Sequence, residues 1–131
     1  MVRKLNLLVV SSRLERKREL LRILDELPLN VYAAGSVEEA DDALRTHGIN
    51  VVLCDERISD GTYHNILALS IYSDPKIQFV LLMTTGGPEE RWKARQLGVT
   101  EVVDARFEPT DIELTLIHAT RGQTPAMHAA G

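Results

Sequence analysis

The chain has 131 residues, one cysteine and a formal net charge of −4, from 15 basic and 19 acidic side chains. This length fits one domain of roughly 100–150 residues, and a single cysteine excludes an internal disulfide or a zinc site made of several thiolates. The acidic balance argues against nucleic acid as the main partner, no apolar run reaches the roughly 18–20 residues of a membrane span, and we expect a cytoplasmic protein.

Five apolar segments of strand length recur along the chain, separated by segments of helix length. The predicted strands cover residues 5–10, 30–34, 50–54, 77–83 and 101–103. The first, third and fourth are rich in Val, Ile and Leu, which is typical of strands that are buried on both faces of a parallel sheet. The order of segments predicts an α/β fold of the doubly wound (βα)5 type, with a five-stranded parallel sheet in the order 2-1-3-4-5 and helices on both faces.

Local signals predict where the helices begin and end. In a capping box, a Ser or Thr side chain and a Glu side chain three residues later satisfy free backbone donors. Such boxes are predicted at Ser12, Ser36 and Thr110. Gly48 is expected as a left-handed cap of the second helix, while Pro88 and Gly98 fit the first turn and the end of the fourth. The third helix, at residues 63–71, shows no clear cap.

Apolar side chains at helical spacing mark the faces of the first and last helices that we expect to be buried. In the first helix they are Leu14, Leu21, Leu24 and Leu27, and in the last they are Ile112, Leu114, Leu116 and Ile117. Gly122 is expected to end the last helix. We therefore predict one domain at residues 1–122, and a flexible tail at residues 123–131, where no periodicity is found.

The residues that directly follow the predicted strands lie at the edge where such folds carry function. In open parallel sheets, ligands bind at the carboxyl ends of the strands, near the point where the strand order reverses. The first and third strands flank that point. The candidate residues are therefore Ser11, Ser12 and Asp55, followed by Thr84 and Ala105.

In element order and in several local strings, the chain resembles the receiver domains of response regulators, which are flavodoxin-like domains of two-component signalling. The resemblance covers about residues 4–121. It implies that Asp55 holds the position of the carboxylate that takes a phosphoryl group from a kinase's phosphohistidine. The matching strings are residues 7–10, 51–55, 58–61, 80–85 and 97–99.

Several positions depart from the receiver pattern. The acidic pair that helps the acceptor Asp to hold Mg²⁺ is replaced by Ser11 and Ser12, and the Lys that neutralises the phosphoryl group is replaced by Ala105. The family's hydroxyl position falls on Thr84, or on Met83 if no gap is placed in the preceding helix. Since neutral hydroxyls are poor ligands for Mg²⁺, we expect no Mg²⁺ or only weak binding at Asp55.

These replacements favour a degenerate receiver, or pseudoreceiver, that acts in phosphorelay signalling by protein–protein contact and is not an enzyme. One alternative is a fully phosphorylatable regulator in which Arg57 or Arg106 stands in for the missing Lys. Arg106 also replaces the family's Pro, so we expect a trans peptide bond before it. A second alternative is an enzyme or small-ligand binder at the crevice between strands 1 and 3, although no nucleophile–base pair or cofactor motif is visible there.

The resemblance also implies partners, namely a sensor histidine kinase or phosphotransfer protein and a downstream signalling protein. Receivers dimerise or signal through helix 4, strand 5 and helix 5, and a homodimer through this region is one expected outcome. Trp and Arg are enriched at interface hot spots. The candidate contact residues there are Trp92, Arg95, Arg106 and Phe107. Residues 1–22 carry seven Lys or Arg and two Glu, which indicates either a solvated helix face or a partner site.

Overall fold

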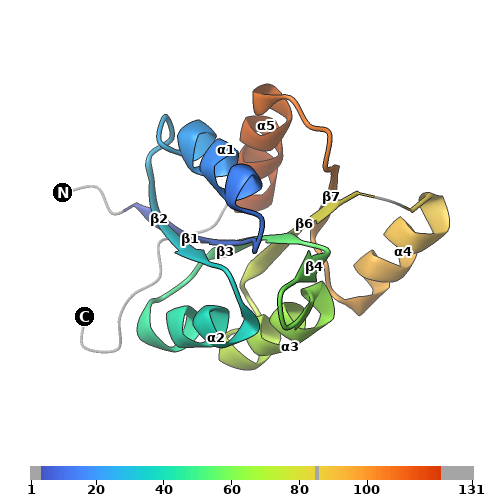
Figure 1. The fold of residues 1–131 in the computed structure, drawn as a ribbon, viewed down its shortest axis with the longest axis horizontal. Helices are drawn as coiled ribbons and strands as arrows, with labels where there is room; N and C mark the ends of the chain where they lie inside the picture. The colour runs from blue at the N-terminus through green and yellow to red at the C-terminus, as the bar shows by residue number, and fades with distance from the viewer. Residues whose placement is uncertain (1–3, 85, 122–131) are drawn as a thin grey trace.

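The computed structural model describes residues 4–84 and 86–121. Within them, five strands form one parallel sheet in the order β2-β1-β3-β6-β7 (Figure 1). The strands are β1 (Leu5–Val10), β2 (Leu29–Ala34), β3 (Val51–Asp55), β6 (Gln78–Met83) and β7 (Glu101–Asp104). This is the predicted order 2-1-3-4-5, so the doubly wound fold is confirmed. The predicted ends of the chain's domain, Gly122 and the tail at 123–131, lie outside the described residues.

Helices cover both faces of the sheet (Figure 1). They are α1 (Leu14–Leu24), α2 (Val37–Thr46), α3 (Tyr63–Ser73), α4 (Pro88–Leu97) and α5 (Pro109–Thr120). The side chains of α1 and α5 pack in one core, and those of α2, α3 and α4 pack in another on the opposite face. None of the helices in the described ranges combines the length and the apolar character that crossing a membrane requires.

Strand side chains alternate between the two cores, as the period of two in a strand requires. Leu8 and Val52 face α2 and α3, whereas Leu7 and Leu53 face α1 and α5, and all four are fully buried. The strands β1, β3 and β6 are buried along nearly their whole length. This is the burial that their continuous apolar runs predicted.

Two of the predicted capping boxes are wrong. Arg13, and not Ser12, is the residue that precedes the first turn of α1, and no side chain caps that end. At α5 the box predicted at Thr110 is replaced by an earlier start, where the backbone N–H of Glu108 donates to the Asp111 carboxylate over 2.8 Å. In both cases a residue that is favourable for capping by type does not lie at the cap position, because the preceding loop determines where the helix begins.

The other helix ends follow the predictions in part. Ser36 caps α2 by accepting a hydrogen bond from the Glu39 N–H over 3.0 Å. Gly98 ends α4 at a φ of 121°, as expected for a position that favours glycine. Gly48 is not a left-handed cap, because among the described residues only Gly86 and Gly98 have positive φ. The start of α3, for which no cap was predicted, has a Thr62–Asn65 capping box.

Three apolar side chains that were expected in the core are exposed. Leu14 is 59% exposed, Leu114 61% and Ile117 57%. The buried residues of α1 and α5 are Leu20, Ile23 and Leu24 in the first and Ile112, Leu116 and Ala119 in the second. Each helix therefore buries a stripe narrower than its apolar content suggested, and α5 places leucine and isoleucine on the surface.

A short antiparallel ladder between β3 and α3 was not predicted. It consists of β4 (Arg57–Ile58) and β5 (Gly61–Thr62). Ile58 is buried, whereas Arg57 is exposed, so the ladder directs Arg57 to the outside next to the end of β3. Gly61, the first residue of β5, lies close to α3, and a Cβ there would lie 2.6 Å from the Asn65 side-chain oxygen, so a larger residue would displace that side chain.

Candidate functional site

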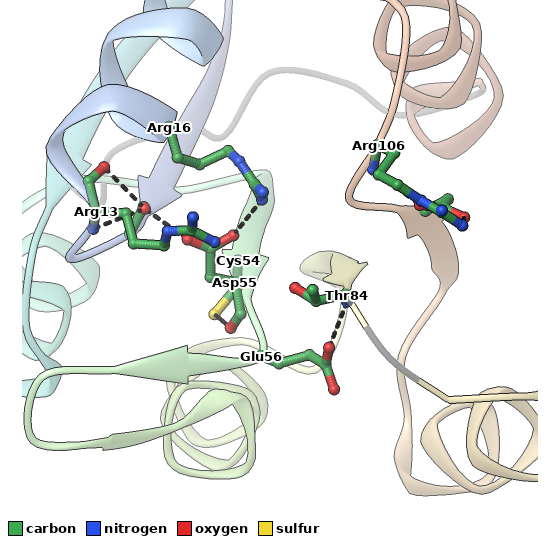
Figure 2. Close-up of polar contacts among 9 residues, drawn as sticks. Arg13, Arg16, Cys54, Asp55, Glu56, Thr84 and Arg106 are labelled. Carbon is green, nitrogen blue, oxygen red and sulfur yellow. Dashed lines mark hydrogen bonds and ion pairs between the residues drawn. The ribbon is translucent and has the colours of Figure 1, made fainter.

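Asp55 is the last residue of β3 and lies at the carboxyl edge of the sheet, 5% exposed. Both of its carboxylate oxygens have partners (Figure 2). The Ser11 hydroxyl donates to Oδ2 over 2.6 Å, and Nη1 of Arg16 donates to Oδ1 over 2.9 Å. Since a buried polar group is costly without such partners, these two contacts offset the burial of the Asp55 side chain.

Ser11 reaches Asp55 because β1 and β3 are neighbours. Its backbone N–H donates to the carbonyl of Ala34 over 3.0 Å and extends the β1–β2 ladder by one residue. The chain then turns, and the Ser11 hydroxyl accepts a hydrogen bond from the Arg13 N–H over 3.2 Å. Ser11 therefore contacts both the acidic side chain and the start of α1. Ser12, the other predicted position of the acidic pair, is exposed.

Arg16 connects three parts of the molecule. It lies in the first turn of α1, its side chain is 12% exposed, and it forms an ion pair with Asp55 at the end of β3. Its guanidinium carbon lies 5.7 Å from the ring centroid of Phe107, which belongs to the loop between β7 and α5. A cation held over an aromatic face is attracted by the ring. Arg16 therefore ties α1 to the strand end and to that loop.

Arg16 appeared in the sequence only as one of several basic residues near the N-terminus. A signal for its position is nevertheless present, because Arg16, Leu20 and Ile23 follow one another at spacings of four and three residues. Residues at this spacing share one helix face, and that face of α1 is buried. A cation on an otherwise apolar stripe needs a buried partner, and here the partner is Asp55.

A pocket of about 410 Å³ opens beside Asp55. Its lining residues are Arg13, Asp55, Glu56, Arg57 and Thr84. The carboxylate of Glu56 accepts a hydrogen bond from the Thr84 backbone N–H (Figure 2). Neither guanidinium in the lining forms an ion pair with any residue that the structure describes.

The remaining predicted site residues are distributed around this edge. Thr84 is exposed at the pocket wall, whereas Met83 is buried in the core. Ala105 is buried, and its N–H donates to the Met83 carbonyl over 3.0 Å. The structure therefore brings Thr84 to the same pocket as Asp55, and leaves no charged side chain at the position of the family's Lys.

Arg106 does not supply charge to Asp55 in this structure. Its guanidinium pairs with Asp104, with Nε 3.4 Å from Oδ1, and the side chain extends away from Asp55 (Figure 2). The Asp104 carboxylate also accepts the backbone N–H of Arg106 over 2.8 Å. As expected, the peptide bond before Arg106 is trans, since the described residues contain no cis bond.

The candidate contact residues near α4 and β7 differ in exposure. Trp92 is 61% exposed on α4, and Arg95 pairs with Glu101 of β7 over 3.7 Å. Phe107 is buried under Arg16, so it offers little area to a partner. A groove of about 380 Å³ runs between β7 and α5, with the exposed Leu114 in its lining.

Cys54, next to Asp55, is fully buried. Burial raises the pKa of its thiol well above the ordinary value, and the negative charge of Asp55 raises it further. Because the thiolate is the reactive form of cysteine, Cys54 behaves as a core side chain. Its position does not make it a nucleophile for the pocket.

The residues at Asp55 do not fit a Mg²⁺ ion. Mg²⁺ requires near-octahedral oxygen coordination, usually with one or two carboxylates. Both oxygens of Asp55 are engaged, and a guanidinium cation lies 2.9 Å away. The second carboxylate of the pocket, that of Glu56, accepts the Thr84 N–H. In the described parts of the chain, no group of three or more His, Cys, Asp or Glu side chains is placed to hold a metal ion.

No protein-family model and no curated protein matches the chain, whereas solved structures do. The non-phosphorylated HemR receiver domain from Leptospira biflexa has 21% identity and a TM-score of 0.83 over 95% of this chain and 100% of that one. The chemotaxis protein CheY4 of Vibrio cholerae has 18% identity and a TM-score of 0.82 over 89% and 99%. The signal receiver domain of an HD domain-containing protein from Pseudomonas fluorescens has 20% identity and a TM-score of 0.84 over 92% and 98%. The chain therefore has the receiver-domain fold.

Proposed function

We propose that this chain is a receiver-type domain of two-component phosphorelay signalling. It works in the cytoplasm through protein–protein contact with a kinase or phosphotransfer protein and a downstream protein. In this proposal Asp55 is a former phosphoacceptor that is held in an ion pair, and phosphorylation that depends on Mg²⁺ is weak or absent. The observation that carries the proposal is the engagement of both Asp55 oxygens by Ser11 and Arg16.

The physical argument compares how cations stabilise negative charge in the starting carboxylate and in the transition state of phosphoryl transfer. Phosphoryl transfer is catalysed by positioning and by cations that neutralise charge as it develops on the transferred group. Arg16 already neutralises Asp55 in the unmodified protein. It therefore stabilises the starting carboxylate, and interactions that favour the ground state do not accelerate the reaction.

The test is treatment with acetyl phosphate, with and without Mg²⁺, followed by intact-mass measurement. We expect no phosphoryl adduct on the unaltered chain. The matched comparison is the triple variant with Ser11→Asp, Ser12→Asp and Arg16→Ala. It restores the acidic pair and removes the bound cation, so it is the variant in which Mg²⁺-dependent phosphorylation is expected to be gained. An Mg²⁺-dependent adduct on the unaltered chain that disappears in Asp55→Asn contradicts the proposal.

The phosphorylatable alternative has one supporting observation, which is that Arg57 and Thr84 line the pocket next to Asp55. In that case Arg57 takes the place of the missing Lys as the neutralising cation. The same mass measurement then shows an adduct on the unaltered chain. Arg57→Gln reduces its rate of formation, whereas Arg106→Gln does not, because Arg106 pairs with Asp104.

For the contact surface over α4, β7 and α5, we propose a second copy of this chain as the occupant. The surface carries both signs of charge, with Arg95 and His118 on either side of Glu101, and the exposed Leu114 and Ile117 lie on α5 of the same face. A two-fold interface joins the same patch of both subunits, so a surface that carries both signs allows opposite charges to meet across the axis. We expect dimers by light scattering, and monomers for Leu114→Glu. If the unaltered chain stays monomeric at high concentration, the proposal that a second copy binds this surface is contradicted.

A further inference from the structure

The pocket beside Asp55 contains two arginines that the receiver resemblance does not explain. Arg13 precedes α1, Arg57 lies in β4, and both line the same pocket as Thr84. Neither guanidinium has an ionic partner among the residues that the structure describes. Figure 2 shows Arg13 and Thr84 on opposite sides of Asp55. Donors from three separate segments therefore converge on one space.

The charge in and around this pocket favours an anion. The carboxylate of Asp55 is already neutralised by Arg16 at 2.9 Å. The remaining charged groups of the lining are Arg13, Arg57 and Glu56. The lining therefore carries two guanidinium groups and, besides Asp55, one carboxylate, so the formal charge balance at the pocket is positive.

We propose that this pocket binds a phosphate-type oxyanion non-covalently and without metal, with Arg13 and Arg57 as its cationic ligands and the Thr84 hydroxyl as a further donor. Guanidinium groups match the oxygens of phosphate with paired, charge-assisted hydrogen bonds. A pocket of about 410 Å³ is in the range of small-molecule sites. It has room for a phosphate group and for part of an organic group attached to it.

This binding differs from phosphorylation in its chemistry. No bond to Asp55 forms, and Asp55 keeps its contacts with Ser11 and Arg16. The site therefore does not depend on whether the proposed loss of phosphorylation is correct. An intact mass measured after each titration separates the two processes, because only covalent modification changes it.

The test is an NMR titration of the full chain in EDTA, in which the amide signals of Arg57 and Thr84 are followed. The probes are inorganic phosphate and phenyl phosphate, each compared with sodium chloride at the same ionic strength. We expect saturable shifts with both phosphates and none with chloride. Tighter binding of phenyl phosphate assigns the site to a phosphorylated organic ligand, and equal binding assigns it to free phosphate.

Variants of the lining make the assignment specific. Arg13→Gln and Arg57→Gln are each expected to weaken phosphate binding by roughly five- to tenfold, as expected when one charge-assisted partner is removed. Glu56→Gln keeps the acceptor oxygen for the Thr84 N–H and removes a negative charge, so it is expected to tighten binding. Arg18→Gln, an exposed cation on α1 outside the lining, is the control. Shifts that do not saturate, or equal losses in the control, overturn the proposal.

Discussion

Arg16 and Asp55 are 39 positions apart in the sequence, yet Nη1 of the arginine lies 2.9 Å from Oδ1 of the aspartate. Their side chains are 12% and 7% exposed, so neither has access to much water. Removing one member of a buried pair leaves the other charge uncompensated, at a cost of about 3–5 kcal/mol. This pair is therefore expected to be a main determinant of stability at the candidate site.

The first prediction is that Arg16→Met lowers the free energy of unfolding by about 3 kcal/mol, because Asp55 is left buried without a cation. Urea denaturation followed by circular dichroism measures this change. Arg106→Met removes an exposed arginine of a surface pair with Asp104 and is the matched control, with an expected change within about 0.5 kcal/mol. Equal effects of the two substitutions contradict the assignment of Arg16 as a buried partner.

A second prediction separates the ion pair from packing effects. In the double variant Arg16→Met with Asp55→Asn, no unpaired charge remains, so its destabilisation is expected to be smaller than the sum of the two single changes. The coupling in this double-mutant cycle should exceed about 1 kcal/mol, as is found for residues in direct contact. Four urea curves measure it. Strict additivity shows that the two charges do not interact.

A third prediction concerns the helix starts. Ser36→Ala removes a cap that accepts the Glu39 N–H at 3.0 Å, and is expected to cost about 1 kcal/mol. Ser12→Ala is expected to change stability by less than about 0.5 kcal/mol, because Ser12 is exposed and α1 has no side-chain cap. Thermal unfolding of both variants compares them directly. The opposite order of effects restores Ser12 as the cap of α1.

The strands and their order were predictable because both depend on short-range pattern and on general rules. Continuous apolar runs indicate strands that are covered on both faces, and helix-length segments between them restrict the connections. Asp55 was found in the same way, since it directly follows such a run. Its environment was not, because the spacing of Arg16, Leu20 and Ile23 marks Arg16 as part of a buried helix face but does not identify its partner 39 positions away.

The residues at the start of α1 and the cation that pairs with Asp55 could not be predicted from local sequence signals. Ser11 and Ser12 are chemically alike, and only the turn after β1 determines that Ser11 faces Asp55. From the sequence, Arg57 and Arg106 were the arginines proposed to supply charge to Asp55 in place of the family's Lys. The structure pairs Asp55 with Arg16 instead, since the first turn of α1 carries its side chain across the end of β3.

A fourth prediction uses Cys54. Burial, with a smaller contribution from the charge of Asp55, raises the pKa of its thiol well above the ordinary value. Reaction with iodoacetamide at pH 8 is therefore expected to be negligible in the folded chain, because reaction requires the thiolate. In urea the same thiol should react completely, and mass spectrometry counts the product. Rapid and complete labelling without urea shows that β3 is less protected than its burial indicates.

The last prediction is a pH dependence at the loop after β7. The hydrogen bond from the Arg106 backbone, followed by the contacts with the Arg106 side chain, lowers the pKa of Asp104. A carboxyl group whose pKa is lower in the folded state stabilises the fold above its unfolded pKa, and this contribution is lost as the pH falls through the folded value. We therefore expect the Arg106 amide signal to be constant from pH 7 to pH 5 and to shift only at more acidic pH. In Asp104→Asn this acid transition should be absent, and a midpoint at or above the ordinary Asp value in the unaltered chain contradicts the contact.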